Sequence, residues 1–279
     1  MPLYDVSYRK YEGPRSSRWS RSFALARSAA ALLMRRRSFL LLLAACWIPA
    51  VVRAAQIYVS RQFPQAPEFF AITPATWREF LGQQVRFLPV VLVSLATGAS
   101  AIASDFASGA LLLYLSKPIS RFDYLLGKSM VVMVGIAAVT LAPALALLGL
   151  YLALAPNFEL LREPPWLFFS IVGYSLFLAL YFSLAVLAVS SLCRSGRVAG
   201  AGFAAIVFGS EIVSRAAMGG RGAPPFVSMI GSAVDAGYWF FDDTAGGEGP
   251  FYSVMSMVFV MVLSAWVLNR RLRSGEGVL

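Results

Sequence analysis

The chain has 279 residues, of which 58% are hydrophobic and only 14% are charged. Soluble domains carry about 25% charged residues, and several apolar runs here approach or exceed the roughly 20 residues that span a bilayer. These values exclude a soluble protein and predict an all-α integral membrane protein. The net charge of +10 does not indicate nucleic-acid binding, because the basic residues cluster beside apolar runs, as positive-inside loops do.

Residues 1–37 are predicted to form a cytoplasmic arm that contains an amphipathic helix. From Ser17 to Met34, apolar residues recur every three or four positions, and the Arg residues fall largely on the other face. Such a helix is typical of the lipid headgroup region. A cytosolic helix packed on a partner protein is the alternative. Arg35, Arg36 and Arg37 then mark the cytoplasmic edge of the membrane.

Six apolar stretches are predicted to span the membrane, within one transmembrane domain that covers residues 1–279. Pro49 is expected to kink the first span and Pro143 to bend the third. Most of the 24 Lys and Arg residues fall on segments that this arrangement places on one side, which predicts cytoplasmic N and C termini. The predicted spans are residues 39–58, 86–104, 129–155, 166–192, 198–213 and 250–268.

Two of the predicted external segments have helical character. Residues 76–79 are expected to begin a short helix on the outer interface, anchored by Trp77. Residues 225–241 form a half-apolar stretch that is expected to lie on this interface or dip into it. The external aromatic residues either anchor the interface, which we favour, or contact a lipid-like substrate: Trp77, Trp166, Tyr238, Trp239 and Phe240.

The most informative stretch runs from Asp105 to Lys128, between the second and third spans. Leu residues in its first half fall on one face at helical spacing, and Asp105 is expected to cap the start of this helix. Pro118 ends the helix, and Ser120 is expected to cap the next one, which returns to the bilayer. We therefore predict a short amphipathic helix on the cytoplasmic membrane surface.

The order of residues in this loop resembles that of ABC-2 type permeases, the membrane subunits of one group of ABC transporters. The family pattern has an acidic residue four positions before a Gly, then Leu-Ser-x-Pro-Ile-Ser-Arg, then Gly-Lys. This chain has Asp105 and Ala110 where the family more often has Glu and Thr. Within the family, this loop particularly resembles that of permeases encoded beside nitrous oxide reductase maturation genes. The matching positions are Asp105, Gly109-Ala110-Leu111, Leu115-Ser116-Lys117-Pro118-Ile119-Ser120-Arg121 and Gly127-Lys128.

The resemblance implies that the loop is a coupling helix that binds a groove of a separate ATPase subunit. It also implies an N-terminal elbow helix, a homodimer or a dimer with a paralogous permease, and a place in the cytoplasmic (inner) membrane. An ordinary loop with a surface helix is the alternative, and plain positive-inside anchoring is the alternative role for Lys128 and the other basic residues. The predicted coupling residues are Asp105, Gly109, Leu111, Leu112, Leu115, Lys117, Pro118 and Arg121.

No nucleotide-binding or catalytic motif is found in the sequence. Gly127-Lys128-Ser129 matches the end of a phosphate-binding loop, but Phe122 occupies the position of the required Gly. The chain has no His, and neither of its two Cys has a partner at metal-ligand spacing. We therefore expect no cofactor in this chain, with ATP and Mg²⁺ on the partner subunit.

The predicted function is export or flipping of a substrate, in preference to uptake, with an external accessory protein as a further possible partner. One alternative is a membrane anchor that transmits mechanical work without transport. Another is a membrane-embedded enzyme, which the absence of His and of a carboxylate pair in the spans disfavours. Substrate-stimulated ATP hydrolysis would separate transport from anchoring.

Glu211 is an acidic residue in or near a predicted span, where ionisable groups are costly and indicate function. It is expected to contact substrate or to gate the outer end of the pathway. Arg215 follows four residues later, in the order that favours an ion pair on a helix. An interfacial ion pair that closes the fifth helix is therefore the alternative, and we favour it.

Overall fold

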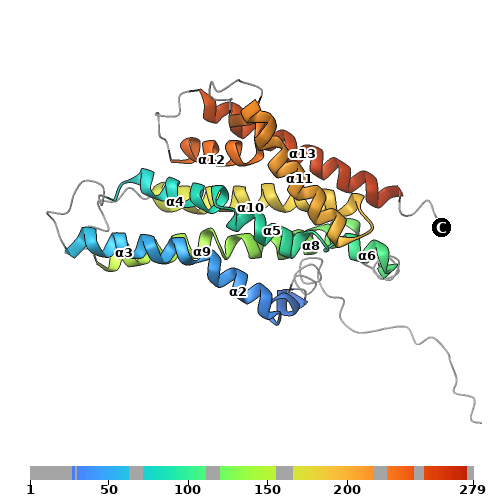
Figure 1. Cartoon of the computed structure of the whole chain (residues 1–279), viewed down its shortest axis with the longest axis horizontal. Helices are drawn as coiled ribbons and strands as arrows, with labels where there is room; N and C mark the ends of the chain where they lie inside the picture. Colours follow the sequence, from blue (N-terminus) through green and yellow to red (C-terminus); the bar gives the residue numbers. More distant parts are fainter. Residues whose placement is uncertain are drawn as a thin grey trace, which may run out of the picture.

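A computed structural model of the chain describes residues 27–28, 30–62, 72–110, 120–154, 166–216, 225–241 and 248–274. These residues form helices and turns and no strand, which confirms the predicted all-α class (Figure 1). The helices are α2 (Arg37–Cys46), α3 (Ile48–Gln62), α4 (Pro74–Arg86), α5 (Pro89–Gly98), α6 (Ala103–Ala107), α8 (Arg121–Ala137), α9 (Leu141–Ala153), α10 (Trp166–Leu192), α11 (Gly196–Ala216), η3 (Pro225–Val227), α12 (Met229–Phe240) and α13 (Gly249–Ser274).

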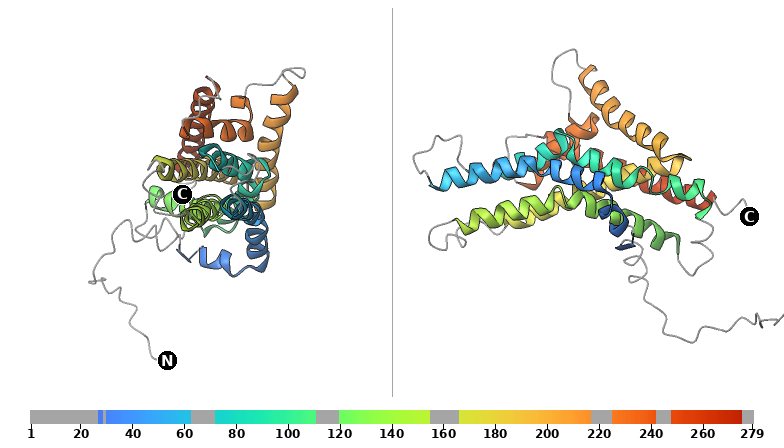
Figure 2. Two further views of the ribbon diagram at one scale, coloured as in Figure 1. Left: turned by 90° about the vertical axis from the view of Figure 1, so that its left-hand side faces the viewer. Right: turned by 60° about the horizontal axis from the view of Figure 1, so that its bottom comes forward.

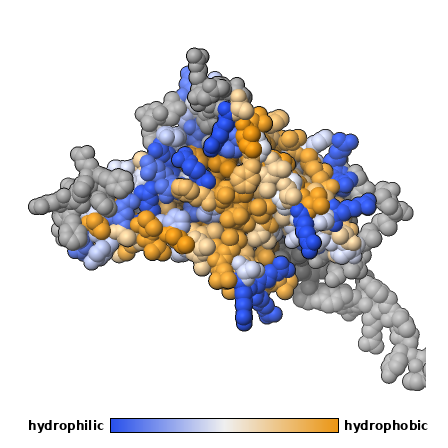
Figure 3. All heavy atoms as spheres, viewed as in Figure 1, coloured by the Kyte–Doolittle hydropathy of each residue, from blue (hydrophilic) through white to orange (hydrophobic). Residues whose placement is uncertain are grey.

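Six helical stretches are long and apolar enough to cross a membrane, as the sequence predicts. On the face shown in Figure 3, apolar atoms gather in the middle of the molecule and hydrophilic atoms lie toward its ends. We call these two ends the α6 end and the α12 end, after the helices that lie there in Figure 1. The candidate spans are Arg37–Ser60, Pro89–Ala107, Phe122–Ala153, Trp166–Leu192, Gly196–Ala216 and Gly249–Arg271.

Helix α10 lies at the centre of the bundle. It packs against α5, α8, α11 and α13, and also touches α4, α6, α9 and α12. In its apolar stretch 67% of the residues are buried within the chain, against 17% in the first and fifth spans. Tyr174, Tyr181 and Phe182 are among its fully buried side chains. The end-on view of Figure 2 shows α11 at the edge of the bundle, where its apolar face is left for lipid or a partner.

Two spans are interrupted next to a proline, as predicted. Helix α2 ends at Cys46 and α3 begins at Ile48, directly before Pro49. Helices α8 and α9 are separated by the turn at residues 138–140, shortly before Pro143. Proline has no N–H to bond the preceding turn and its ring clashes with that turn, so each break lies on the N-terminal side of the proline.

A helix is present where residues 76–79 were expected to begin one, but it is longer than predicted and Trp77 is buried rather than an interface anchor. Helix α4 begins at Pro74 after a capping box between Thr73 and Thr76, and it continues to Arg86. Trp77 is 3% exposed, and its ring lies edge-on to Tyr151 with centroids 6.2 Å apart. Trp77 is therefore a core residue that joins α4 to α9. The length of α4 was underestimated because a helix with one polar face contains no continuous apolar run.

The second span is also less regular than predicted. Residues 86–104 are not one helix, because the chain turns at Phe87 and Leu88, where Leu88 has a φ of 76°. A second break separates α5 from α6 between Gly98 and Ala103. Pro89 explains the first break, since it occupies the first turn of α5 and cannot continue α4.

The two predicted helix caps around the central loop have different outcomes. Ser120 accepts a hydrogen bond from the Asp123 amide at 3.1 Å, which confirms it as the cap of α8, and α8 begins at Arg121 as this cap predicts. Asp105 is not a cap, because α6 starts at Ala103 and Asp105 lies in its first turn. Most of the predicted elbow helix at residues 17–34 lies outside the described residues.

Candidate functional site

Ser190 holds the break between α5 and α6 against the central helix. Its hydroxyl accepts hydrogen bonds from the amides of Ile102 at 3.1 Å and Ala103 at 3.0 Å, and donates to the carbonyl of Ala99 at 2.8 Å. The Ser190 side chain is fully buried. Buried backbone groups that leave a helix need such partners, so one hydroxyl of α10 allows the chain to bend here.

Small residues press this bend against its neighbours. A Cβ on Gly98 would lie 2.4 Å from Val186 of α10, and a Cβ on Gly196 would lie 2.8 Å from the Cβ of Ser100. The bend is thus packed between α10 and the start of α11 without room for a methyl group. The small residues of the second span therefore allow close helix packing.

An ion pair joins α6 to α8 just beyond the bend. Lys128 lies 2.8 Å from the Asp105 carboxylate and also donates to the carbonyl of Ala101 at 2.8 Å. The Tyr124 hydroxyl donates to the same carboxylate at 2.6 Å. The side chains of Asp105 and Lys128 are 13% and 14% exposed. We call Asp105, Tyr124, Lys128 and Ser190, with the bend at residues 99–102, the α6 joint.

Few of the predicted coupling residues can be placed. Asp105 points into the α6 joint, where its carboxylate is bound within the chain, rather than outward to a partner subunit. Gly109 lies in the exposed turn after α6 with a φ of 69°, a conformation that favours glycine. Leu111, Leu112, Leu115, Lys117 and Pro118 lie outside the described residues, and only the backbone of Arg121 is described, as the first residue of α8.

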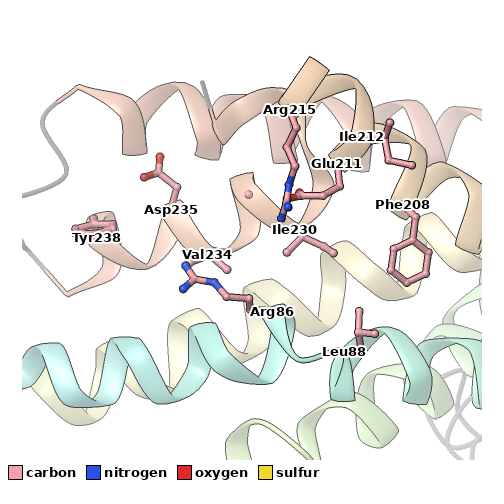
Figure 4. A pocket seen from close by; sticks show the side chains of 11 residues that line it. Arg86, Leu88, Phe208, Glu211, Ile212, Arg215, Ile230, Val234, Asp235 and Tyr238 are labelled. Atoms are coloured by element: carbon pink, nitrogen blue, oxygen red, sulfur yellow. The ribbon is translucent and has the colours of Figure 1, made fainter. Parts of the chain in front are cut away.

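A cavity of about 850 Å³ opens at the α12 end, between the α4–α5 junction, α11 and α12 (Figure 4). Each of the three elements contributes both apolar and charged side chains to its lining. A smaller cavity of about 340 Å³ adjoins it and shares Arg86, Val234 and Tyr238. The apolar lining residues are Leu88, Phe208, Ile212, Ile230 and Val234, and the charged ones are Arg86, Glu211, Arg215 and Asp235.

Glu211 is the centre of a polar cluster between α11 and α12. Arg215 donates to it from Nε at 3.0 Å and forms an ion pair at 2.8 Å. The Ser228 hydroxyl also donates a hydrogen bond to Glu211, and the Ser210 hydroxyl accepts one from the Met229 amide at 3.1 Å. The expected ion pair is confirmed within α11, and the two hydrogen bonds from Ser228 and Met229 fasten the end of α11 to the start of α12. Glu211 lines the cavity as well, so its contact with substrate stays a prediction.

Asp235 and Tyr238 line the cavity from α12. Asp235 accepts a hydrogen bond from Ser253 of α13 at 2.6 Å. Burial raises the pKa of Asp235 above its usual value, and the Ser253 hydrogen bond acts in the opposite direction. Arg78 of α4 stacks on the Tyr238 ring, with its guanidinium carbon 3.7 Å from the ring centroid. These contacts fix the cavity wall between three helices.

Arg86 differs from the other charged residues of the cavity. It is the last residue of α4, it is exposed, and its side chain extends from α4 into the cavity toward α12 (Figure 4). Within the described part of the chain it has no hydrogen bond or ion pair. Gln84, two residues earlier, is fully buried, and neither polar atom of its amide has a partner among the described residues. Arg86 is therefore exposed and unpaired among the described residues, whereas the buried Gln84 does not line either of these cavities.

The fold and the two sites define a helical, multi-pass membrane protein with a bent, tightly packed joint at one end and a charged cavity at the other. The family model of ABC-2 family transporter protein matches residues 24–224, so the chain belongs to this family. The matched residues include the α6 joint and all cavity residues that α4, α5 and α11 contribute. A search of curated proteins finds no match. Permeases of the ABC-2 family generally pair with an ABC ATPase and are themselves typically non-catalytic.

Proposed function

We propose that this chain is the permease subunit of an ABC exporter or flippase, driven by a separate ATPase subunit that binds its central loop. The observation that carries this proposal is the α6 joint. The loop follows α6 directly, and α6 is tied to α8 by the Asp105–Lys128 ion pair and to α10 by Ser190. A movement of the loop would therefore be passed to the centre of the bundle.

The charged cavity at the α12 end supports transport over a purely mechanical anchor. It lies between α11, α12 and the α4–α5 junction, and the small residues Gly98 and Gly196 bring the other ends of α5, α10 and α11 into contact at the joint. The same helices thus connect the joint to a space that can hold a ligand. Alternating exposure of that space would follow from a change in how these helices pack.

The proposed orientation places the α6 end and both termini in the cytoplasm, in the cytoplasmic membrane. Arg194, Arg197, Arg270 and Arg271 border the spans there, as positive-inside loops do. The cavity then lies near the outer interface, where exposed Trp239 and Trp166 are found. This position favours export or flipping over uptake. The sparsely buried first span, and the face of the fifth span that does not line the cavity, are the proposed contact with a second permease.

The test is co-purification of the ATPase with the chain in mild detergent, followed by ATP hydrolysis in reconstituted membranes. Replacing Leu112 by Glu should lower the recovered ATPase by about tenfold or more, because a central apolar contact of an interface is lost. Leu192→Glu is the matched control, since Leu192 is an exposed leucine at the same end outside the loop. Equal recovery with both variants would reject the coupling role of the loop.

Substrate-stimulated hydrolysis would then separate transport from mechanical anchoring. The likeness to permeases encoded beside nitrous oxide reductase maturation genes is a finer proposal. It is tested by whether an ATPase gene and such maturation genes adjoin the gene of this chain.

A further inference from the structure

We propose that the cavity at the α12 end binds an amphiphile that carries one oxyanion group, phosphate or carboxylate, on an apolar body. Arg86 is the residue that would bind the oxyanion. This inference rests on the proposed function, because it names the chemical class of ligand that the cavity of the permease takes.

The charge of the ligand follows from which lining groups are already paired. Glu211 and Arg215 form an ion pair at 2.8 Å, and Arg86 attracts Glu211 more weakly than Arg215 does. The Asp235 carboxylate keeps its charge but accepts a hydrogen bond from Ser253 of α13. Arg86 is left with five N–H donors and no hydrogen-bond or ion-pair partner within the described residues. A guanidinium presents these donors as a planar fork that matches two oxygens of a phosphate or carboxylate. The cavity therefore offers one unused site for an oxyanion.

The apolar part follows from the apolar side chains that line the same cavity. Phe208 and Ile212 of α11 line the cavity and are 41% and 67% exposed, and Leu88 and Ile230 line it as well. Contact of these side chains with water is unfavourable in proportion to their apolar area, about 25 cal/mol per Å². A ligand with an apolar body would cover them, whereas a small hydrated anion would leave them exposed.

The depth of the cavity in the membrane fits an amphiphile. Arg86 lies just before the span that begins at Pro89, and Ile212 lies four residues before the end of the span that finishes at Ala216. Helix α12 is not among the candidate spans. Arg86 thus lies at the level where headgroups meet acyl chains, and the apolar wall of α11 continues into the hydrocarbon region. Exposed Trp239, which packs on Phe251 with centroids 6.0 Å apart, marks the same level.

The experiment measures binding of radiolabelled decyl phosphate to the full-length chain in a neutral maltoside detergent. The same measurement on Arg86→Gln gives the label that enters micelles or binds elsewhere. Subtracting it from the wild-type value gives the binding that depends on Arg86. Arg86→Gln should lower the affinity by about tenfold or more, as expected for the loss of charge-assisted hydrogen bonds. Arg197→Gln is the matched control, since Arg197 is an exposed arginine at the other end of α11, and it should bind like wild type.

Three unlabelled competitors identify the source of the oxyanion. Dioctanoyl phosphatidylglycerol should displace the Arg86-dependent label, decanol should not, and inorganic phosphate should require at least a hundredfold higher concentration, because each octanoyl or decyl body adds several buried CH₂ groups of about 0.8 kcal/mol each. Equal binding by wild type and Arg86→Gln would overturn the oxyanion site. Displacement by inorganic phosphate as readily as by the lipid would overturn the amphiphile.

The proposed function is judged separately, by recovery of the ATPase with the wild-type chain. A chain that recruits the ATPase but lacks Arg86-dependent binding rejects the ligand class alone. A chain that binds decyl phosphate through Arg86 and recruits no ATPase rejects the coupling proposal and leaves the binding site in place.

Discussion

The α6 joint and the α12 cavity are built from the same long helices, yet they treat polar groups in opposite ways. At the joint, the Ser190 hydroxyl and the Asp105 carboxylate each make two or three contacts within the chain. At the cavity, Arg86 has no hydrogen-bond or ion-pair partner among the described residues. The polar groups of the joint are satisfied within the chain, whereas the cavity has an arginine that can still bind a ligand.

This difference teaches how the two ends divide the work of a transporter. A joint that passes on movement must be stiff, which requires satisfied hydrogen bonds and packing without voids. A ligand site must keep some polar groups unpaired so that a ligand gains more than water did. Substitutions at the joint should therefore be costly for stability, and substitutions at the cavity should change stability little.

The largest expected effect is the loss of the Ser190 hydroxyl. Ser190→Ala leaves the buried amides of Ile102 and Ala103 and the carbonyl of Ala99 without this partner. Each unsatisfied buried group costs roughly 1–3 kcal/mol, with partial relief by relaxation, so we expect a loss of about 3 kcal/mol. The free energy of unfolding in a detergent titration measures it.

Ser191 provides the control for this prediction. It is the next residue on α10, it is also buried, and its hydroxyl donates to the carbonyl of Ala188 in its own helix. Ser191→Ala should cost less than about 1 kcal/mol. If both variants lose the same free energy, the bend is held by packing rather than by the Ser190 hydroxyl.

The second effect is the loss of the Lys128 ammonium. Lys128→Met keeps the length of the side chain but leaves the Asp105 carboxylate with Tyr124 alone. Removing one partner of a buried pair costs about 3–5 kcal/mol, and the remaining Tyr124 bond and slight exposure should reduce this to about 2 kcal/mol. The same detergent titration measures the loss, and ATP hydrolysis by the reconstituted complex reports whether coupling weakens with it.

A double variant separates the charge pair from general packing. Asp105→Asn combined with Lys128→Met removes both charges, so no charge is left buried without its partner. The double variant should be more stable than the sum of the two single losses implies. Strict additivity would show that Asp105 and Lys128 do not stabilise each other.

Much of the fold was predictable because a bilayer imposes simple rules. Apolar runs of bilayer length gave six spans, and Pro49 and Pro143 gave the breaks in two of them. Helix α4 could not be placed this way, since its buried face of Trp77, Phe80 and Leu81 is covered by other helices rather than by lipid. Hydropathy reports the lipid-facing runs, and it does not report a polar helix that packs on neighbours.

The sites were predictable only where their residues are close in sequence. Glu211 and Arg215 are four residues apart on one helix, so their ion pair could be inferred. Asp105 is far from Lys128 in the sequence, and Ser190 is far from Ile102. No local pattern indicates that the members of either pair meet. For this reason membrane anchoring was offered as the alternative role of Lys128, and its ion pair was not predicted. Arg86 was missed because its significance lies in the absence of a partner within the described chain, which only the structure reveals.

The smallest expected effect concerns Asp235 at the cavity, and it depends on pH. Burial raises the native pKa of Asp235, so the native state keeps this proton to higher pH than the unfolded chain does. The stability that this provides is complete below the ordinary Asp value of about 3.9 and is lost as pH rises through the raised native value. Asp235→Asn has no such proton, so wild type should lose stability relative to the variant as pH rises from about 4.

Thermal midpoints of both proteins in maltoside detergent between about pH 4 and pH 7 measure this difference, which should amount to no more than a few degrees. Ser253→Ala sharpens the prediction. The Ser253 hydroxyl donates to the Asp235 carboxylate at 2.6 Å and favours its charged form. Without this hydroxyl the native pKa should rise further, and the loss of stability should move to higher pH. A difference that stays constant with pH would mean that the cavity hydrates Asp235 well enough to leave it an ordinary carboxylate.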